Sequence, residues 1–403
     1  MLLRWLVLFS ALCFLSALAL RRLLKTLGPR FWARHERLLQ RALGLLVLAL
    51  VLAEFTAKRY APVGGGPWRV ALAVLRGGFL IAWLGALASL VGALVSRLVV
   101  RFWKEPARPL PEAPGAPLER SGLTRREALD RGFTGAGLAV ASAVVLRGGM
   151  KARYGLRLTD VTLTVPTLPP ELEGFTLVQL TDLHVGLFTG APELEHLVDE
   201  ALRARGDVIV LTGDLLDHAP RHIPEALRRL SRLRAPRGVY SILGNHDHTT
   251  GARQVARGLQ RARLHPLVNA GLTLPGTAGR RPGLYLAGVD DVWAGRFVPG
   301  ANPDLPRALG QRAPEEPAVL LAHNPVFFME SAGLVDVQLS GHTHGGQVNL
   351  GGLPGALLPF IAGRYTRRGS GLFVSRGVGV TGPPVRINAP PELVRIALTA
   401  RRV

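Results

Sequence analysis

The first quarter of the chain contains three apolar runs, at residues 5–20, 38–53 and 77–96. Each is close to the ~20 residues that cross a bilayer as an α-helix. The runs have no polar face, and arginine-rich loops separate them, which argues against the alternative of buried helices in a soluble domain. We therefore predict a membrane region with three transmembrane helices in residues 1–104.

Basic residues around these runs set the expected topology. The segment from Arg21 to Arg41, which ends just inside the second run, carries seven Lys and Arg residues, whereas the loop between the second and third runs offers Lys58, Arg59 and Arg69 near its ends. By the positive-inside rule the first loop is cytoplasmic, and so is the arginine-rich segment after the third run. Residues 105–131 of that segment, rich in Pro and Arg, are predicted to form a cytoplasmic linker.

A fourth apolar run, at 132–146 in the segment 132–150, determines on which side of the membrane the remaining chain lies. It is short and rich in small residues, and it follows Arg125 and Arg126 in a pattern resembling an internal twin-arginine export signal. If the run spans, the rest of the chain is outside; if it lies at the interface, the rest is inside. We predict a multi-pass cell-membrane protein with an extracytoplasmic C-terminal domain.

From residue 156 onward, short β-rich runs alternate with amphipathic helical segments. This alternation is typical of α/β domains, so residues 155–403 are predicted to form one. The predicted strands are 176–180, 208–211, 239–243, 284–289, 319–322, 337–340, 372–375 and 394–398. The predicted helices are 192–205, 224–233 and 252–263.

Composition limits the chemistry that this domain can use. The 403 residues carry a net charge of +21, but the excess of Arg, Ala, Leu, Gly and Pro recurs in every region, as genome-wide base bias would produce. Nucleic-acid binding is therefore not expected. Cys13 is the only cysteine, which excludes an intrachain disulfide and an all-cysteine metal site. Any metal ion must be held by His, Asp, Glu or Asn.

Candidate metal ligands follow five of the predicted strands. The runs are Asp182-Leu183-His184, Gly213-Asp214, Gly244-Asn245-His246-Asp247, His323-Asn324 and Gly341-His342-Thr343-His344. Such strands end at the sheet edge where α/β folds bind ligands, and an i, i+2 pair in a tight loop can converge on one ion. Carboxylate and imidazole donors together favour Mn, Fe or Zn, with Mg as a further candidate. The glycines before Asp214, Asn245 and His342 are expected to let the backbone approach the ions closely.

These motifs, in this order, resemble the signature of the calcineurin-like metallophosphoesterases over roughly the last three fifths of the chain. The segments 340–347, 375–379 and 384–392 further resemble a bacterial membrane-associated branch described as phosphodiesterases or phosphohydrolases. The resemblance implies a four-layer αββα sandwich.

The resemblance also implies a role for each residue of the motifs. The first ion would be held by Asp182, His184, Asp214 and His344. The second would be held by Asp214, Asn245, His323 and His342, so that Asp214 bridges the two ions. His246 would face the substrate phosphate without binding metal, and Asp247 would orient it.

Two divalent ions side by side lower the pKa of a bridging water, and the resulting hydroxide would attack the phosphoryl group. His246, when protonated, would stabilise the transition state or donate a proton to the leaving oxygen. The predicted function is hydrolysis of phosphate esters, with phosphodiesters or pyrophosphates favoured. Lipid-linked substrates are expected because the domain is tethered beside a bilayer, and no protein partner is evident.

Several alternatives compete with this prediction. A nuclease or nucleotide phosphatase would suit the net charge, but a nuclease is expected to have an aromatic-lined groove, and aromatic residues make up only 6% of the chain. A catalytically inert scaffold of the same fold would lack ligands, whereas both i, i+2 pairs are complete. A channel or transporter would carry ionisable residues inside its spans, and only Glu54 and Arg76, near span ends, come close. The remaining histidines outside the motifs are interpreted as surface or loop residues, namely His35, His196, His218, His222, His248 and His265.

Overall fold

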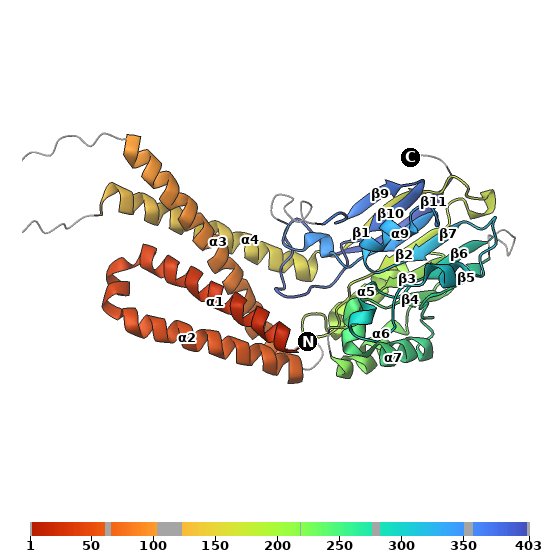
Figure 1. Cartoon of the computed structure of the whole chain (residues 1–403), viewed down its shortest axis with the longest axis horizontal. Coiled ribbons are helices and arrows are strands. Elements are labelled where there is room, and N and C mark those ends of the chain that lie inside the picture. Colours follow the sequence, from red (N-terminus) through yellow and green to blue (C-terminus); the bar gives the residue numbers. More distant parts are fainter. Residues whose placement is uncertain are drawn as a thin grey trace, which may run out of the picture. The chain divides into compact units, whose positions relative to one another are not determined.

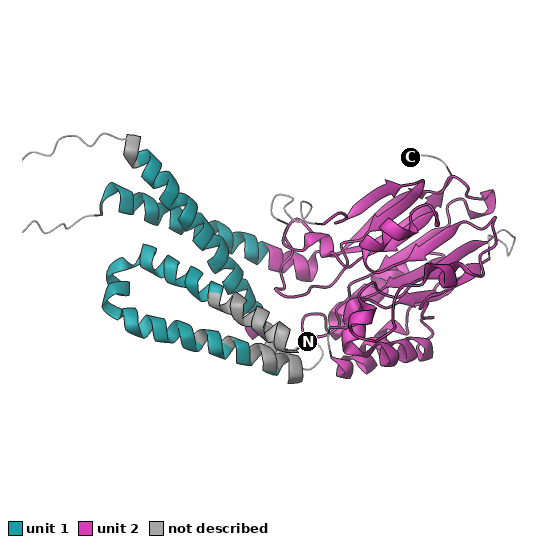
Figure 2. Cartoon of the chain, viewed as in Figure 1, with its two compact units in different colours: residues 1–56, 72–147 teal, residues 57–71, 148–403 magenta. Residues whose placement is uncertain are grey.

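The computed structural model describes residues 2–60, 66–102, 123–217, 219–275, 283–349 and 358–400. The chain divides into two compact units (Figure 2). The helical unit comprises residues 1–56 and 72–147, and the C-terminal unit comprises residues 57–71 and 148–403.

The helical unit is built from long helices. They are α1 (Leu2–Leu27), α2 (Pro29–Tyr60), α3 (Gly66–Phe102) and α4 (Arg125–Tyr154), whose last turns belong to the C-terminal unit. Small residues let α3 and α4 pack closely, since a Cβ on Gly137 would lie 2.1 Å from the Cβ of Ala88. In the described part of the chain, two segments are long and apolar enough to cross a membrane, Ala71–Val99 and Arg125–Tyr154.

These two segments contain the third and fourth predicted apolar runs. The first and second runs lie in α1 and α2, and their crossing of a membrane stays a prediction. Residues 105–122 of the predicted linker lie outside the described residues, and α4 begins at Arg125, so the end of that linker is helical.

The C-terminal unit contains two mixed β-sheets (Figure 1). The first sheet has the order β1-β11-β2-β3-β4, with β1 (Arg157–Thr164), β11 (Glu392–Thr399), β2 (Thr176–Leu180), β3 (Val208–Thr212) and β4 (Val239–Ile242). The second has the order β5-β6-β7-β8-β10-β9, with β5 (Ala270–Leu274), β6 (Leu284–Gly288), β7 (Ala318–Leu321), β8 (Val337–Ser340), β10 (Ser370–Val374) and β9 (Gly363–Arg367).

Apolar residues fill the space between the sheets and cover both outer faces. Leu177 of β2 and Leu339 of β8 belong to one buried cluster that joins the two sheets. A second cluster packs α5 (Ala191–Arg203), α6 (Ile223–Leu230) and α7 (Asn245–Arg261) onto the first sheet. On the second sheet, α8 (Leu305–Leu309) and α9 (Phe328–Ser331) cover further clusters. Each fully buried Leu contributes roughly 1.5–3 kcal/mol. The predicted four-layer αββα sandwich is confirmed.

Candidate metal centre

The predicted ligands lie in loops that directly follow strands. Asp182 follows β2, Asp214 follows β3, Asn245 follows β4, His323 follows β7 and His342 follows β8. The first three of these strands run parallel in one sheet, and the last two run parallel in the other. Each sheet therefore presents its polar loops at a single edge, as expected for ligand binding by α/β folds.

Five of these residues have left-handed backbone conformations. The φ angles are 55° at Asp182, 46° at His184, 52° at Asp214, 69° at His342 and 52° at His344. A non-glycine residue in this region costs of order 1–3 kcal/mol and persists only where its surroundings hold it there. The concentration of such residues in the ligand loops indicates a local conformation kept for function rather than for stability.

A first cluster joins the loops after β2 and β8. The Nε2 atoms of His184 and His344 are 3.0 Å apart, and Nε2 of His344 lies 3.4 Å from Oδ1 of Asp182. All three side chains are buried, and their ligand atoms lie within 4.8 Å of one another. Two imidazole nitrogens and a carboxylate oxygen that converge in this way can hold one divalent cation.

A second cluster joins the loops after β3, β7 and β8. Nε2 of His323 lies 3.2 Å from Oδ2 of Asp214 and 3.3 Å from Nδ1 of His342. Nδ1 of His323 is 2.8 Å from the carbonyl oxygen of Thr212, which can only accept, so this nitrogen carries the proton. The other ring nitrogen of His323 is thereby directed at the cluster.

One carboxylate oxygen serves both clusters. Oδ2 of Asp214, 3.2 Å from His323, is also 3.7 Å from Nε2 of His184 in the first cluster. The other oxygen, Oδ1, accepts a hydrogen bond from the main-chain amide of His246 at 2.8 Å. Asp214 is fixed at one end and directed between the clusters at the other, so it can bridge two cations.

The side-chain oxygen of Asn245 is a candidate ligand. Asn245 is buried, with 8% of its surface exposed, and its Oδ1 has no hydrogen-bond partner among the described residues. A buried amide oxygen left without a donor is unfavourable by about 1–3 kcal/mol. Metal coordination would satisfy it, which is evidence from the chain itself that the donor set suits a metal ion.

Two of the motif glycines are required by close approach. A Cβ on Gly244 would lie 2.2 Å from Oδ1 of Asp214, and a Cβ on Gly341 would lie 2.3 Å from Oδ2 of Asp182. Neither distance is tolerated by a real Cβ, so any larger residue would displace a ligand carboxylate. The expectation that glycine lets the backbone approach the ions is met at these two positions.

Comparison with known proteins identifies the family. The sequence profile of the calcineurin-like phosphoesterases matches residues 175–346, which include every predicted ligand. The uncharacterized metallophosphoesterase YkuE of Bacillus subtilis (strain 168) is 30% identical over 290 residues, which cover 68% of this chain and 98% of YkuE. The chain belongs to the calcineurin-like metallophosphoesterases. It is accordingly a phosphoesterase, and the predicted resemblance is confirmed.

Two further comparisons extend this result. A bovine protein described as a transmembrane protein with metallophosphoesterase domain is 31% identical over 275 residues, which cover 65% of this chain and 62% of the bovine protein. The match thus spans less than two thirds of that relative. Among solved structures, the sulfate thiohydrolase SoxB of Thermus thermophilus aligns over 58% of each chain at 15% identity with a TM-score of 0.36. A likeness at that level adds nothing about function.

Burial sets the charge of three imidazoles of the phosphoesterase. It lowers the pKa of His184 to about 3 and that of His342 to about 4, and it takes the pKa of His344 well below its usual value. These rings are neutral at pH 7 and can bind a cation without releasing a proton. Burial would also lower the pKa of His323, but the charge of Asp214 outweighs it and raises that pKa well above the usual range.

His246 lies beside the first cluster. Its ring is 4.5 Å from that of His184, edge to face, and its Nδ1 is 3.6 Å from Oδ1 of Asp217. Burial would lower the pKa of His246, but the nearby charges of Asp214 and Asp217 raise it. The protonated form is thereby favoured, as a group that stabilises negative charge or donates a proton requires.

The structure gives the carboxylate of Asp247 other partners than His246. It accepts hydrogen bonds from the main-chain amides of Leu215 at 3.0 Å, Leu216 at 3.2 Å and Gly244 at 3.0 Å. Asp247 therefore caps the first turn of α7 and ties it to the loop after Asp214. The carboxylate that faces His246 is Asp217, which lies outside the recognised motifs.

Arg386, in the segment 384–392, is a further residue of the site whose role the motifs do not reveal. Its guanidinium is fully buried and donates to the carbonyl oxygens of Gly379, Arg376 and Ala389. Its Nη2 lies 3.3 Å from Nδ1 of His344. Burial lowers the pKa of Arg386 to about 10, so it stays charged at pH 7. A buried cation at that position helps to keep the ring of His344 neutral.

A second polar group adjoins the other cluster. His248, interpreted from the sequence as a surface or loop residue, is buried, and its Nε2 lies 2.6 Å from Oδ1 of Asp290. Asp291, next in the chain and 1% exposed, accepts from the amide of Trp293, whose ring lies 4.8 Å from that of His342. The sequence feature that could have indicated this polar group is the acidic pair Asp290-Asp291, directly after the predicted strand at 284–289. His222 is also buried, whereas His218 lies outside the described residues.

Proposed function

We propose that the phosphoesterase binds two divalent cations side by side and hydrolyses phosphodiester or pyrophosphate bonds. The first cation would be held by Asp182, His184, Asp214 and His344. The second would be held by Asp214, Asn245, His323 and His342. The observation that carries the proposal is the position of Asp214 Oδ2 between His184 and His323. The mixed oxygen and nitrogen donors favour Mn, Fe or Zn, with Mg a weaker fit.

When bound, such cations activate water and neutralise charge on the phosphoryl oxygens. The chain's own residues supply the rest of the chemistry. His246, held protonated by two carboxylates, is the group that would face the leaving oxygen and give it a proton. Asp217 orients its ring, and in this proposal it takes the role that the motifs suggested for Asp247.

Membrane association supports substrates that carry a lipid. The two long apolar segments Ala71–Val99 and Arg125–Tyr154 and the transmembrane description of the bovine relative both indicate a phosphoesterase attached to a membrane. A site held at a bilayer meets amphiphilic phosphate esters at high local concentration. In the proposal the chain crosses the membrane several times, with the C-terminal unit outside the cytoplasm.

Hydrolysis by the full chain in nanodiscs tests the reaction. After chelation, Mn, Zn, Fe or Mg is returned, and bis-p-nitrophenyl phosphate is compared with p-nitrophenyl phosphate. We expect two bound ions per chain by elemental analysis, and a higher kcat/KM on the diester. Asp214→Asn is expected to reduce turnover by at least 100-fold and metal content to one ion or fewer. His265→Gln, at an exposed histidine, is the matched control and should change neither.

Two outcomes would contradict the proposal. Full activity of the chelated protein would rule out a metal requirement, and one ion per wild-type chain at saturation would rule out a dinuclear centre. Topology is tested separately with a reporter fused after the last residue. A reporter active only in the cytoplasm would reverse the proposed orientation.

A further inference from the structure

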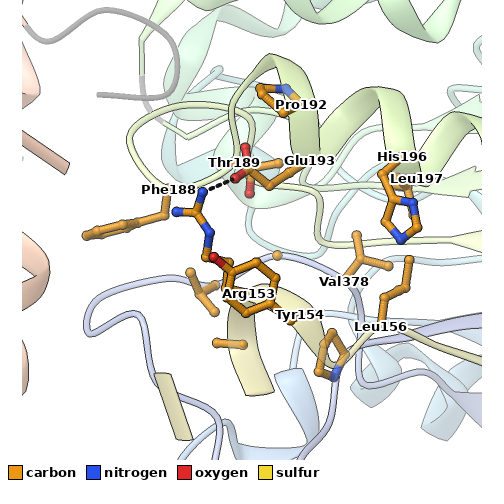
Figure 3. A pocket seen from close by; sticks show the side chains of 14 residues that line it. Arg153, Tyr154, Leu156, Phe188, Thr189, Pro192, Glu193, His196, Leu197 and Val378 are labelled. Carbon is orange, nitrogen blue, oxygen red and sulfur yellow. Dashed lines mark ion pairs between the residues drawn. The ribbon is translucent and has the colours of Figure 1, made fainter. Parts of the chain in front are cut away.

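A pocket of about 280 Å³ lies in the C-terminal unit between the last turn of α4, the start of α5 and the loop 378–380 (Figure 3). We call it the α4 pocket. Its apolar wall includes Leu156, Phe188, Leu197, Val378 and Val380. A cavity of roughly 150 Å³ is enough to bind benzene, so this one can take a chain of several methylene groups.

The pocket is separated from the metal centre by main chain. Gly379, which lines it, donates its amide to the carbonyl oxygen of Asp182 at 2.7 Å. Phe188 and Thr189, also in the wall, follow His184 along the same loop. The pocket thus adjoins the back of the loop that carries two predicted ligands. No predicted ligand side chain lines it, so an occupant would not reach the cations.

Helix α4 carries an exposed apolar stripe that ends at the pocket. Leu146, Met150 and Tyr154 recur every four residues, so they lie on one face of the helix. Their exposed fractions are 66%, 67% and 74%. An exposed apolar stripe on a helix long and apolar enough to cross a membrane is expected to face lipid. Tyr154 is both the end of the stripe and part of the pocket wall.

The charges at this end of α4 are mainly positive. Arg147, Lys151 and Arg153 lie in its last two turns, and Arg153 pairs with Glu193 across the pocket at 3.5 Å (Figure 3). Arg153 is the cation of the pocket wall, and Arg147 and Lys151 add positive charge to the same end of the helix. An alkyl chain with an anionic head matches both parts.

We propose that the α4 pocket is a binding site for one alkyl chain of an anionic bilayer lipid, which stays bound and is not the substrate. The apolar wall takes the alkyl chain, and Arg153 faces the head group. Such a lipid would brace the loop of Asp182 and His184 against the end of the membrane helix. The proposal concerns binding only and does not depend on the reaction at the metal centre.

Photo-crosslinking in nanodiscs tests this site. The full chain is reconstituted with phosphatidylglycerol or phosphatidylcholine that carries a diazirine in one acyl chain, illuminated, digested and mapped by mass spectrometry. We expect wild-type labelling on peptides that contain Phe188, Leu197 or Val378, with and without chelator. Labelling by the anionic lipid should exceed that by the zwitterionic lipid about fivefold if one cation engages the head group.

Two variants that fill the pocket from different elements sharpen the test. His196→Trp on α5 and Val378→Trp in the loop 378–380 should each reduce pocket labelling at least fivefold. Glu195→Trp is the matched control, because it adds the same side chain one residue away on α5 at a position that does not line the pocket. It removes the pair of Glu195 with Arg229, which keeps its pair with Glu225. Hydrolysis of bis-p-nitrophenyl phosphate monitors folding of all three.

Wild-type mapping alone can overturn the proposal, even if both filling variants misfold. Labels confined to Leu146 and Met150, with none in the pocket wall, would show that lipid covers the helix but does not enter. Loss of the phosphate head from pocket-bound lipid in the metal-loaded wild type, but not in Asp214→Asn, would make the occupant a substrate. Labelling that persists in both filling variants would show that the alkyl chain of the lipid binds outside the α4 pocket.

Discussion

Nδ1 of His246 lies 3.6 Å from Oδ1 of Asp217, and both groups adjoin the cluster formed by Asp182, His184 and His344. The pair joins residues 29 positions apart, one after β3 and one in the first turn of α7. It places a carboxylate behind the one imidazole of the motifs that is not proposed to bind metal. This is the arrangement that fixes the orientation of a catalytic imidazole.

Asp217→Asn is expected to reduce kcat on bis-p-nitrophenyl phosphate by about 10- to 100-fold, with little change in metal content. The amide keeps the shape of the side chain but removes the charge that helps to raise the pKa of His246. The pKa of His246 should therefore fall, and the alkaline fall in the pH–rate profile should shift to lower pH. Elemental analysis and steady-state kinetics at several pH values measure both effects.

Asp247→Asn provides the contrast for that variant. Its carboxylate accepts from three main-chain amides, so its replacement should lower the apparent Tm by several degrees and leave the pH–rate profile largely unchanged. If Asp247→Asn instead shifted the profile and Asp217→Asn did not, the orienting role would belong to Asp247.

The sequence allowed the buried strands to be predicted better than the edge strands. All five residues of β3 are buried, and the apolar run Val208-Ile209-Val210-Leu211 has no other plausible location. By contrast, the edge strand β9 consists of Gly363–Arg367 and is largely exposed, and β1, at the edge of the other sheet, begins with residues that are mostly exposed. Such strands form because a neighbour offers hydrogen bonds, and the local pattern contains no sign of the neighbour.

The predicted metal ligands could likewise be recognised from local sequence, whereas the residues that hold them in place could not. His342 and His344 could be predicted because residue type, spacing and position after a strand all lie in one short segment. Arg386 contacts His344 across 42 positions of the chain, and the burial of its guanidinium depends on three carbonyl groups of neighbouring loops. An arginine in a proline-rich segment is ordinarily exposed at the protein surface, so the role of Arg386 could be recognised only from the tertiary structure.

Asn245→Ala is expected to lower occupancy of one cation site only. Its Oδ1 is a buried acceptor without a hydrogen-bond partner in the described part of the chain, so removal of the amide should weaken the second site while Asp182, His184 and His344 remain. Metal titration should change from two ions per chain to one tight and one weak ion, with affinity at the weak site reduced by at least tenfold. A uniform loss at both sites would contradict this assignment.

Arg386→Lys is expected to destabilise the C-terminal unit and loosen His344. Lysine keeps the charge but cannot reach several carbonyl groups in a plane, so charged hydrogen bonds worth roughly 2–4 kcal/mol in total are lost. The apparent Tm should fall by about 5–10 °C, and metal affinity should fall with it. Arg395→Lys is the matched control, because Arg395 forms an exposed pair with Asp160 that contributes little. Equal losses in the two variants would assign Arg386 no special role.

The metal-free protein is expected to lose stability as the pH falls from about 6.5 to 4. Burial keeps the pKa of His184 at about 3 and that of His342 at about 4, below the ~6.5 of an unfolded histidine. In that window the unfolded chain binds protons that the folded chain does not, so stability rises with pH by up to about 1.4 kcal/mol per unit for each ring. Asp247 offsets the contribution of one ring to this slope, because burial and the charge of Asp214 raise its pKa in the folded chain to about 6.

Thermal unfolding of the chelated protein between pH 4 and 7 measures this slope. His184→Gln should make the dependence shallower, since the amide cannot titrate, whereas His265→Gln at an exposed position should leave it unchanged. Asp247→Asn should make it steeper, because the opposing proton uptake disappears. An apparent Tm that stayed constant or rose on acidification would mean that these imidazoles are charged in the folded chain. In that case a cation would have to displace protons from them, and metal binding would weaken steeply below pH 6.5.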